Sequence, residues 1–293
     1  MSLQAHLTAQ REAIDLLLGR LLPEAENRPA ELHQAMRYTL LAPGKRVRPL
    51  LTLMCGEMLG AQREPLLRAA CAIEMVHASS LIMDDLPCMD DASLRRGKET
   101  CHQVFGESTA LLAALGLLNR AFGVLAELRR QGIPAVRAAE AVAVLSRAIG
   151  SEGIIAGQAA DLQAGKGPCN IQTLEYIHSH KTGKLFIASA EMGALLAGSG
   201  RRERKALVRF AMNLGLAFQI ADDLLDASAD RETLGKDVRQ DKGRTTFATV
   251  CGVEGAAELA GELIDHAVEA LGNLGDKAHF LRDLAERIRE RAA

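Results

Sequence analysis

Apolar side chains recur at spacings of three and four residues along almost the whole chain, and this periodicity is typical of amphipathic α-helices. Clear breaks fall at glycine and proline, for example at Pro43 and Gly44. We predict helices, in chain order, over residues 6–22, 30–42, 46–59, 65–84, 107–130, 134–150, 152–164, 171–198, 202–226, 254–272 and 276–291. No alternating strand pattern, low-complexity tract or long linker separates them. The sequence therefore predicts an all-α fold, a single domain over residues 1–293 whose helices pack around a shared interior.

Composition limits the partners that this chain can have. Hydrophobic residues make up 48% of the 293 residues, which is enough for a large core, and the formal net charge is −2. There is no long basic run, no Trp and only 3% aromatic residues, so we expect no nucleic-acid partner. The six cysteines include no C-x-x-C pair, so a zinc site is not indicated.

Targeting signals are not apparent in the sequence. Residues 1–20 do not resemble a secretory signal, because Arg11, Glu12, Asp15 and Arg20 interrupt them. No uninterrupted apolar run reaches the roughly 18 residues that a membrane span needs. We therefore expect a cytoplasmic protein without stable membrane insertion.

Two acidic clusters each follow an apolar helical segment. The first, LIMDDLPCMDD at residues 81–91, contains Asp84, Asp85, Asp90 and Asp91. The second, FQIADDLLD at residues 218–226, contains Asp222, Asp223 and Asp226. Asp222 and Asp226 are four positions apart, so they share a helix face, whereas Pro87 places Asp90 on a turn beyond the helix end.

Each acidic cluster alone is also typical of a solvated helix surface. Two clusters at the ends of apolar helices indicate more, because such carboxylates can face each other across a cavity. Hard oxygen ligands of this kind suit Mg²⁺, which keeps several waters and bridges to substrate phosphates. The pair of clusters therefore predicts a clamp that holds a diphosphate through Mg²⁺ ions.

Cations accompany these carboxylates in four short motifs, PGKRVRP, LRRG, HKTGK and GKDVRQDK. Their candidate phosphate-binding residues are Lys45, Arg46, Arg48, Arg95, Arg96, Lys181, Lys236 and Lys242. The first motif stands at a predicted helix start, where backbone amides favour anions. Each cation alone is compatible with a solvated surface, but together they indicate a polyanionic substrate, since Arg and Lys both suit phosphate.

The chain resembles the trans-prenyl diphosphate synthases, the farnesyl and geranylgeranyl diphosphate synthase family, from about residue 30 to the C-terminus. The motifs that carry the resemblance are, in order, PGKRVRP, HASSLIMDDLPCMDDASLRRGKETCHQVFGE, GQAADL, KTGKL, FQIADDLLD and GKDVRQDKGRTTF. The first acidic cluster, two residues longer than DDxxD, looks like that of short-chain bacterial and plant members. PGKRVRP and DDLPCMD look like the bacterial geranylgeranyl diphosphate synthases.

The resemblance implies an isoprenoid synthase fold, with antiparallel helices around a deep central cavity, and a homodimer. It implies Mg²⁺-dependent condensation of isopentenyl diphosphate with an allylic diphosphate, namely dimethylallyl, geranyl or farnesyl diphosphate. The allylic substrate would ionise, the two substrates would condense, and a proton would be eliminated. None of the motif side chains is an obvious base, so the released diphosphate is expected to accept that proton. Residues 228–244, rich in charge and glycine, are expected to close over the diphosphate.

The resemblance also implies roles for individual residues. The Mg²⁺ ligands would be Asp84, Asp85, Asp90, Asp222, Asp223 and Asp226. The allylic diphosphate would contact Arg95, Lys181 and Lys236, with Gln158 and Asp161 as secondary polar contacts. The diphosphate of isopentenyl diphosphate would contact Lys45, Arg48, His77 and Arg96. Thr182, Phe218 and Gln219 would line the reacting centre. The residues that carry catalysis would be Asp84, Asp85, Asp90, Arg95, Lys181 and Asp222. Taken alone, His77 and Phe218 are equally compatible with core positions, and Asp91 and His102 receive no role.

Product length is predicted from the helix that ends at Asp84. A helix rises about 5.4 Å per turn, roughly one isoprene unit, so this helix would measure the growing tail. Ser80 and Ser79 stand four and five residues before Asp84, where bulky aromatics in the family stop the tail at fifteen carbons. Both are small, so we expect geranylgeranyl diphosphate, with Val76 and Met75 as candidates for the floor. Farnesyl diphosphate is the alternative, because a facing helix near residues 109–118 can also block the tail.

Two more distant alternatives remain open. A terpene cyclase is also helical with acidic metal motifs, but it needs an aromatic-lined cavity, and this chain has few aromatic residues. A non-catalytic partner subunit of a synthase could lose an acidic cluster, whereas both clusters are intact here.

Overall fold

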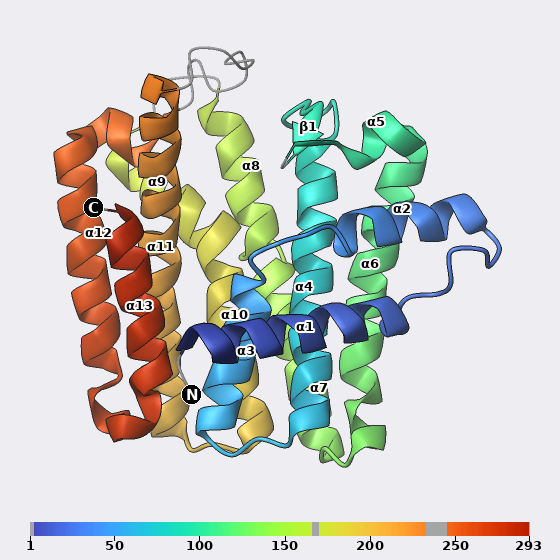
Figure 1. The fold of residues 1–293 in the computed structure, drawn as a ribbon, viewed down its shortest axis with the longest axis horizontal. Helices are drawn as coiled ribbons and strands as arrows, with labels where there is room; N and C mark the ends of the chain where they lie inside the picture. The colour runs from blue at the N-terminus through green and yellow to red at the C-terminus, as the bar shows by residue number, and fades with distance from the viewer. Residues whose placement is uncertain (1–2, 96, 166–169, 233–244, 293) are drawn as a thin grey trace. The chain divides into compact units, whose positions relative to one another are not determined.

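The structure is a computed structural model that describes residues 3–95, 97–165, 170–232 and 245–292, and most of these residues are helical (Figure 1). The all-α prediction is confirmed. The chain gathers into two compact units, residues 1–145 and 146–293. The prediction of one domain over residues 1–293, with a deep central cavity, stays a prediction.

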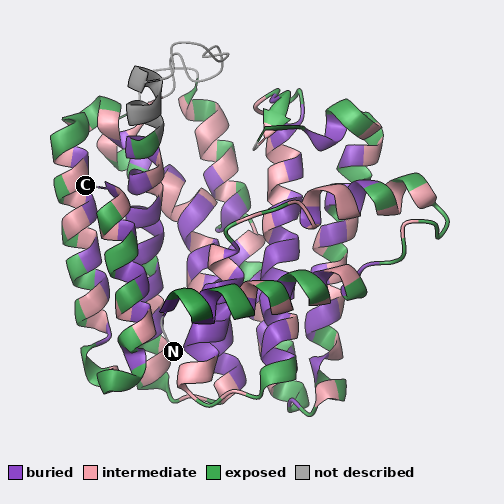
Figure 2. Ribbon diagram, viewed as in Figure 1, coloured by how far each residue is buried: buried purple, intermediate pink, exposed green. Residues whose placement is uncertain are grey.

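The first unit is built around the long helix α4. In chain order it contains α1 (Leu3–Leu21), α2 (Ala30–Leu40), α3 (Val47–Met58), α4 (Arg63–Asp85), β1 (Leu94–Arg95), β2 (Lys98–Glu99), α5 (Cys101–Phe105), α6 (Glu107–Glu127), η1 (Leu128–Gln131) and most of α7 (Ala135–Ile149). Helix α4 packs against α6, α3 and α1. Ala69, Cys71, Ile73 and Met75 are fully buried, and Figure 2 colours much of α4 as buried. A helix that is apolar on nearly every side belongs in a core, and α4 is such a helix.

Small residues bring α6 close to α4. Ala110, Ala113 and Ala114 of α6 are fully buried. The hydroxyl of Ser79 on α4 donates to the carbonyl oxygen of Ala114 at 2.8 Å. The two helix backbones therefore approach closely in the layer that the sequence predicts to measure the product.

Two stretches of the described residues are long and apolar enough to cross a membrane by length and composition, Arg63–Asp85 and Glu107–Gln131. In the most apolar 18 residues of each stretch, 72% are buried in the case of α4 and 39% in the case of the stretch that contains α6. Glu74 interrupts the first stretch and Arg120 interrupts the second, so neither is an uninterrupted apolar run.

The second unit is built around α11. It contains α8 (Ile154–Ala164), α9 (Ile171–His178), η2 (Ser179–Gly183), α10 (Lys184–Ala197), α11 (Arg201–Glu232), α12 (Phe247–Ala270), η3 (Gly272–Ala278) and α13 (His279–Ala292). Helix α11 packs against α12, α10 and α13. At the contact with α10, a Cβ on Gly215 would lie 3.1 Å from Cβ of Phe186, so glycine allows the close approach.

The observed elements depart from the predicted ones at four places. A hairpin pairs β1 with β2 through a turn at Gly97, whose φ is 75°, so the expectation of no strand is wrong here. The short helix α5 was not expected. A π-helical turn, η2, interrupts the predicted helix 171–198. Element α12 begins at Phe247, where Thr246 and Thr249 form a capping box, but it is kinked at Gly252 (φ 78°, ψ 164°), so the predicted helix 254–272 matches the part after the kink and the capped part before the kink was not expected.

Candidate active site

The first acidic cluster lies where α4 ends. Pro87 holds Leu86 in an extended conformation (φ −61°, ψ 151°), and the helix stops directly after Asp85. The chain then folds back, because the amide of Asp90 donates to the carbonyl oxygen of Asp84 at 2.9 Å. The structure thus confirms that Asp90 lies on a turn beyond the helix end, with its backbone beside that of Asp84.

Asp85 is only 3% exposed and is bound by Arg95. Nε of Arg95 donates to the two carboxylate oxygens at 2.7 and 3.0 Å, and Nη2 lies 2.6 Å from Oδ1. Burial raises the pKa of Asp85 above its ordinary value, although the hydrogen bond and charge of Arg95 oppose this. The structure therefore brings Arg95 to the acidic cluster, and both oxygens of Asp85 are engaged. A metal-ligand role for Asp85 stays a prediction.

Buried polar side chains anchor the hairpin that follows the acidic cluster. Oγ1 of Thr100 donates to the carbonyl oxygen of Ala92 at 2.7 Å and lies 3.1 Å from Nδ1 of His102. Thr100 and His102 are both buried. The hydroxyl of Tyr38 on α2 donates to the carbonyl oxygen of Glu99 at 2.8 Å. His102, which the sequence left without a role, therefore supports this loop.

Two predicted anion-binding residues meet beside α4. Nη1 of Arg48, in the first turn of α3, lies 3.3 Å from Nε2 of His77, and Lys45 of the same motif is exposed. His77 precedes Asp84 by seven residues, so the two share one face of α4 and lie about 10 Å apart along its axis. His77 is half-buried, and its role in substrate binding stays a prediction.

The two predicted chain-length residues face different ways. Ser79 is 5% exposed and its hydroxyl is bonded to Ala114 of α6. Ser80 is half-buried, and its hydroxyl donates to the carbonyl oxygen of His77 at 2.8 Å. Because Ser80 stands four residues before Asp84, it lies one turn below Asp84 on the same face.

The π-helical turn η2 carries two predicted site residues in the second unit. Nζ of Lys181 donates to Oδ2 of Asp161 on α8 at 2.8 Å. Oγ1 of Thr182 donates to Oε1 of Gln219 on α11 at 3.1 Å. Gln158, three residues before Asp161, is half-buried on α8. Single π-helical turns often occur at functional sites, and here one joins predicted residues from three helices.

Gly157 lets α8 approach this π-helical turn. A Cβ at Gly157 would lie 2.2 Å from the amide nitrogen of Lys181 and 2.7 Å from its Cα. Any larger residue would displace the Lys181 backbone. The motif GQAADL drew attention to Gln158 and Asp161, but the packing role of its glycine is visible only in three dimensions.

Asp223 of the second acidic cluster is buried and bonded on both oxygens. Oδ1 accepts from Nε2 of Gln219 at 3.0 Å, and Oδ2 accepts from the amide of Phe247, the first residue of α12, at 3.2 Å. Asp223 is 7% exposed. Its carboxylate therefore holds the N-terminus of α12 against α11, and a metal role for Asp223 stays a prediction.

Asp222 is bonded to the last turn of the last helix. Nη2 of Arg291 on α13 donates to Oδ1 of Asp222 at 2.7 Å. The same guanidinium lies 5.4 Å from the ring centroid of Phe218, which is 8% exposed and packs against Phe186. Burial of Phe218 favours the core interpretation of this residue. Nothing in the sequence pointed to Arg291.

Several predicted residues fall outside the part of the chain that the structure describes. These are Arg96, Lys236, Lys242 and the side chain of Asp226, together with most of the stretch 228–244. Their roles stay predictions, as does the facing of the two acidic clusters.

The described carboxylates fit a divalent metal that is shared with a substrate. Among the residues that the structure describes, no three His, Cys, Asp or Glu side chains form a ready-made metal group. Mg²⁺ usually takes one or two carboxylates and completes its shell with waters and phosphate oxygens. Asp84 and Asp90 at the end of α4, and Asp222 on α11, are hard oxygen donors of this kind.

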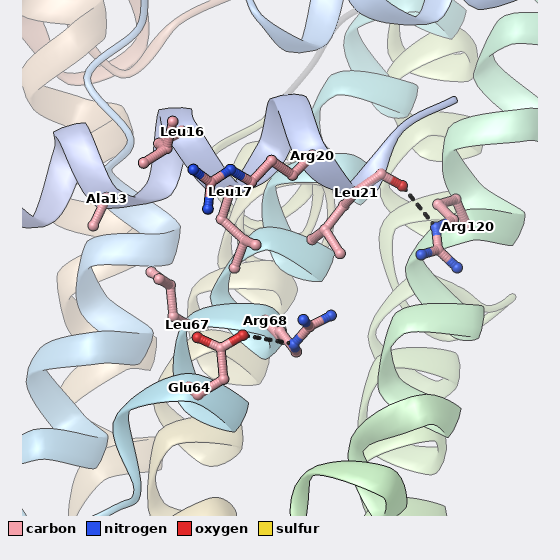
Figure 3. A pocket seen from close by; sticks show the side chains of 9 residues that line it. All are labelled: Ala13, Leu16, Leu17, Arg20, Leu21, Glu64, Leu67, Arg68 and Arg120. Atoms are coloured by element: carbon pink, nitrogen blue, oxygen red, sulfur yellow. Dashed lines mark hydrogen bonds and ion pairs between the residues drawn. The ribbon is translucent and has the colours of Figure 1, made fainter. Parts of the chain in front are cut away.

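A pocket of about 370 Å³ lies elsewhere in the first unit, among α1, α4 and α6 (Figure 3). Leu17, Leu21 and Leu67 line it, with Arg68 paired to Glu64 at its edge. None of the predicted substrate-binding or metal-binding residues is among its lining residues.

Comparison with known proteins identifies the family. A sequence model of the polyprenyl synthetase family matches residues 29–279. The farnesyl diphosphate synthase of Geobacillus stearothermophilus is 43% identical over 275 residues, which cover 93% of this chain and 92% of that protein. The chain belongs to the polyprenyl synthetase family. Geranylgeranyl pyrophosphate synthase 4 of Arabidopsis thaliana is also 43% identical, over 91% of this chain and 72% of that protein.

This polyprenyl synthetase also has close structural relatives. A crystal structure of an FPP/GFPP synthase from Zymomonas mobilis matches it with a TM-score of 0.88, at 36% identity and over 98% of both chains. The predicted isoprenoid synthase fold is thereby confirmed. The family uses a divalent metal for catalysis, which agrees with the donor set at the end of α4.

Proposed function

We propose that this polyprenyl synthetase is a short-chain trans-prenyl diphosphate synthase that joins isopentenyl diphosphate to an allylic diphosphate. One observation carries the proposal. A single face of α4 presents His77, in contact with Arg48, and two turns later Asp84 beside Asp90. Cationic and carboxylate groups about 10 Å apart on one face suit two different diphosphates, one bound directly and one bound through metal.

The cationic end of this face binds isopentenyl diphosphate. Arg48 offers a planar fork of donors, and Lys45 adds a compact charge. Nε2 of His77 lies 3.3 Å from Nη1 of Arg48. Together these residues fix the phosphate end of the substrate and leave its double bond toward the apolar part of the helix face.

The acidic end binds the allylic diphosphate. Bound Mg²⁺ would be held by Asp84, Asp90 and Asp222 and would neutralise charge on the leaving diphosphate. Arg95, fixed by Asp85, supplies a further positive charge at this end. In the second unit Lys181, fixed by Asp161, supplies another.

The reaction breaks the bond between the allylic carbon and the diphosphate oxygen and forms one carbon–carbon bond. The electron pair of that new bond comes from the double bond of isopentenyl diphosphate. A proton then leaves the condensed product, and the released diphosphate accepts it. Apolar surroundings exclude water, which would otherwise quench the cation.

We propose geranylgeranyl diphosphate as the product. Support comes from Ser80, a small residue one turn below Asp84 on the same face, which leaves room for the tail. Farnesyl diphosphate is the second candidate, because the Geobacillus stearothermophilus relative carries that name at 43% identity.

We also propose a homodimer that covers the outer face of α6. Leu112 and Leu115, one turn apart on this helix, are 56% and 50% exposed, and Leu111 beside them is 40% exposed. A contiguous apolar patch of this kind marks an interaction surface. A double substitution, Leu112→Glu with Leu115→Glu, should convert the dimer to monomers in light scattering. A wild-type protein that is monomeric throughout would refute the dimer.

We propose a cytoplasmic location for the protein, without stable membrane insertion. Cys55, Cys71, Cys88, Cys101 and Cys251, the cysteines that the structure describes, are all free thiols. Free thiols are typical of a reducing compartment. Fractionation of producing cells tests the location, and activity in the membrane pellet would contradict it.

The activity itself is tested by incubating the protein with isopentenyl diphosphate, Mg²⁺ and each allylic starter in turn. Chromatography of the dephosphorylated products should show a chain of twenty carbons. A cyclic product from one allylic diphosphate alone would favour a terpene cyclase. Turnover only after addition of a second synthase subunit would favour the partner-subunit alternative.

A further inference from the structure

The three cations of the PGKRVRP motif lie in different surroundings. Lys45 is exposed and Arg48 is half-buried next to His77, whereas Arg46 between them is only 4% exposed. A buried arginine cannot serve a diphosphate from that position. The conformation of Arg46 nevertheless determines where Lys45 and Arg48 lie.

The Arg46 side chain ties together three helices of the first unit. Nε donates to Oδ1 of Asp15 on α1 at 2.8 Å, and Nη1 donates to Oε1 of Glu74 on α4 at 2.7 Å. Nη2 donates to the carbonyl oxygen of Leu40, the last residue of α2, at 3.1 Å and to that of Ala42, just beyond the helix, at 2.9 Å. All three guanidinium nitrogens are thus used, by two carboxylates and by two backbone carbonyls at and just after the end of α2.

The charge on Arg46 is held by its partners. Burial by itself would lower the pKa of Arg46, but Glu74 and Asp15 hold it above its ordinary value. Glu74 is 4% exposed, so loss of the guanidinium would leave a buried carboxylate without its counter-ion.

The backbone of Arg46 is as constrained as its side chain. Its φ and ψ are 50° and 33°, in the left-handed region that residues other than glycine rarely adopt. Its carbonyl oxygen accepts from the amide of Leu50 at 3.0 Å, one of the first hydrogen bonds of α3. The anchored side chain therefore fixes the left-handed backbone at the start of α3. This position lies directly after Lys45 in the loop and two residues before Arg48 in the helix.

Helix α4 contacts the PGKRVRP segment through two residues on one face. Glu74 binds Arg46, and His77, three residues later, contacts Arg48. Residues three apart lie on the same side of a helix. The two contacts together set the register between the loop and the face of α4 that continues to Asp84.

We propose that Arg46 is a positioning residue for the isopentenyl diphosphate site. It does not touch the substrate; it fixes the loop so that Lys45 and Arg48 converge with His77 on one phosphate group. The inference rests on the proposed function, which assigns these three residues to isopentenyl diphosphate.

The test compares three variants in steady-state kinetics, with KM measured separately for each substrate. Arg46→Lys keeps the charge but loses the fork, and KM for isopentenyl diphosphate should rise by about tenfold or more, as a small misplacement of a binding group produces. KM for the allylic diphosphate should stay within about twofold, since the acidic end is untouched. Arg120→Lys is the control, because Arg120 likewise binds a backbone carbonyl and a carboxylate, those of Leu21 and Glu127, away from the site. It should change neither KM.

Lys45→Ala separates this inference from the proposed function. If Lys45→Ala leaves KM for isopentenyl diphosphate unchanged, the site assignment fails before Arg46 is considered. If Lys45→Ala raises that KM but Arg46→Lys does not, the positioning role is overturned. Equal rises in both KM values for Arg46→Lys would also overturn it, since they indicate a general structural effect.

A milder variant covers the case in which Arg46→Lys fails to fold. Asp15 is half-exposed, so Asp15→Asn removes one charged partner of Arg46 without leaving a buried charge. KM for isopentenyl diphosphate should then rise by about threefold, with the allylic KM unchanged. An unchanged KM for both substrates in Asp15→Asn, with Arg46→Lys unfolded, would show that Arg46 serves stability alone.

Discussion

Arg291 and Asp222, 69 residues apart in the chain, form an ion pair in which Nη2 of Arg291 lies 2.7 Å from Oδ1 of Asp222. Asp222 is also the residue of α11 that we propose as a metal ligand. A guanidinium that is bonded to a carboxylate oxygen weakens the binding of a metal ion to the same oxygen. If Asp222 binds metal as proposed, the end of α13 would compete with that metal for the carboxylate.

Substitution Arg291→Gln should increase metal affinity. The pair is partly exposed, at 28% and 34% of the two side chains, so its contribution is small. We expect the Mg²⁺ concentration for half-saturation to fall by about threefold, the effect of a pair worth less than about 1 kcal/mol. Calorimetric titration of Mg²⁺ in the presence of inorganic diphosphate measures this directly.

The control for this titration is Arg289→Gln on the same helix. Arg289 pairs with Asp265 and Glu286, away from the acidic cluster. It should leave the Mg²⁺ titration unchanged. Weaker Mg²⁺ binding in Arg291→Gln would contradict competition and would make Arg291 a support for the site.

Substitution Asp84→Asn should abolish most turnover without unfolding the protein. Asp84 is half-buried at the end of α4, and loss of its charge would weaken binding of the Mg²⁺ that we propose to neutralise the leaving diphosphate. We expect kcat to fall by about 10²- to 10³-fold, as for other losses of charge stabilisation in a transition state. Asp91→Asn is the matched control, since Asp91 is exposed and its left-handed φ of 49° suits Asn. Equal activity of the two variants would remove Asp84 from the metal site.

Substitution Gly157→Ala should destabilise the second unit. The added Cβ would lie 2.2 Å from the Lys181 amide nitrogen, so α8 and η2 must separate. We expect a loss of about 1–3 kcal/mol in the free energy of unfolding by urea, together with reduced activity.

The same measurement on Gly19→Ala should give the opposite sign. Gly19 lies within α1 and a Cβ there would meet nothing within 4 Å. Alanine should add about 0.5–1 kcal/mol through its higher helix propensity. Destabilisation by Gly19→Ala and none by Gly157→Ala would contradict both assignments.

Substitution Ser80→Phe should shorten the product to fifteen carbons. Ser80 lies one turn below Asp84 on the same face, where an aromatic ring would stop the tail. Ser79→Tyr should instead cost stability, because Ser79 is buried against Ala114 of α6. Chromatography of the dephosphorylated products, with thermal melts of both variants, separates the two effects. Unchanged product length in Ser80→Phe would place the ruler on another element.

Alkylation should distinguish the cysteines by burial. Burial raises the pKa of Cys101 to about 11, so its thiolate is scarce at pH 8. Cys88, in the loop after α4, is exposed. Iodoacetamide at pH 8 followed by peptide mass spectrometry should label Cys88 first and Cys101 only after denaturation. Early labelling of Cys101 in the folded protein would show that α5 opens readily.

Periodicity predicted the end of α4 well because the signals there are local. Leucines and alanines define the helix, and Pro87 ends it, so the turn that carries Asp90 could be predicted from adjacent residues. The pairing of Arg95 with Asp85 could also be predicted from the sequence, since the two lie only ten residues apart.

Other features were not accessible, because they depend on contacts between distant residues. The π-helical turn at Lys181 interrupts a stretch whose apolar spacing continues unbroken, and only its contact with Gly157 marks it. Asp223 looks like its neighbour Asp222 in sequence, yet it holds the amide of Phe247. Helical geometry alone could have separated Ser80 from Ser79, because positions four and five residues before Asp84 lie on different faces.

The most direct test follows the label of radioactive isopentenyl diphosphate in reactions with an allylic starter and Mg²⁺. We predict that label enters an acid-labile, extractable product only when starter and metal are both present, and that Asp84→Asn and His77→Ala each suppress this incorporation. Consumption of the starter without incorporation of label would contradict the assignment of two diphosphate sites to one face of α4.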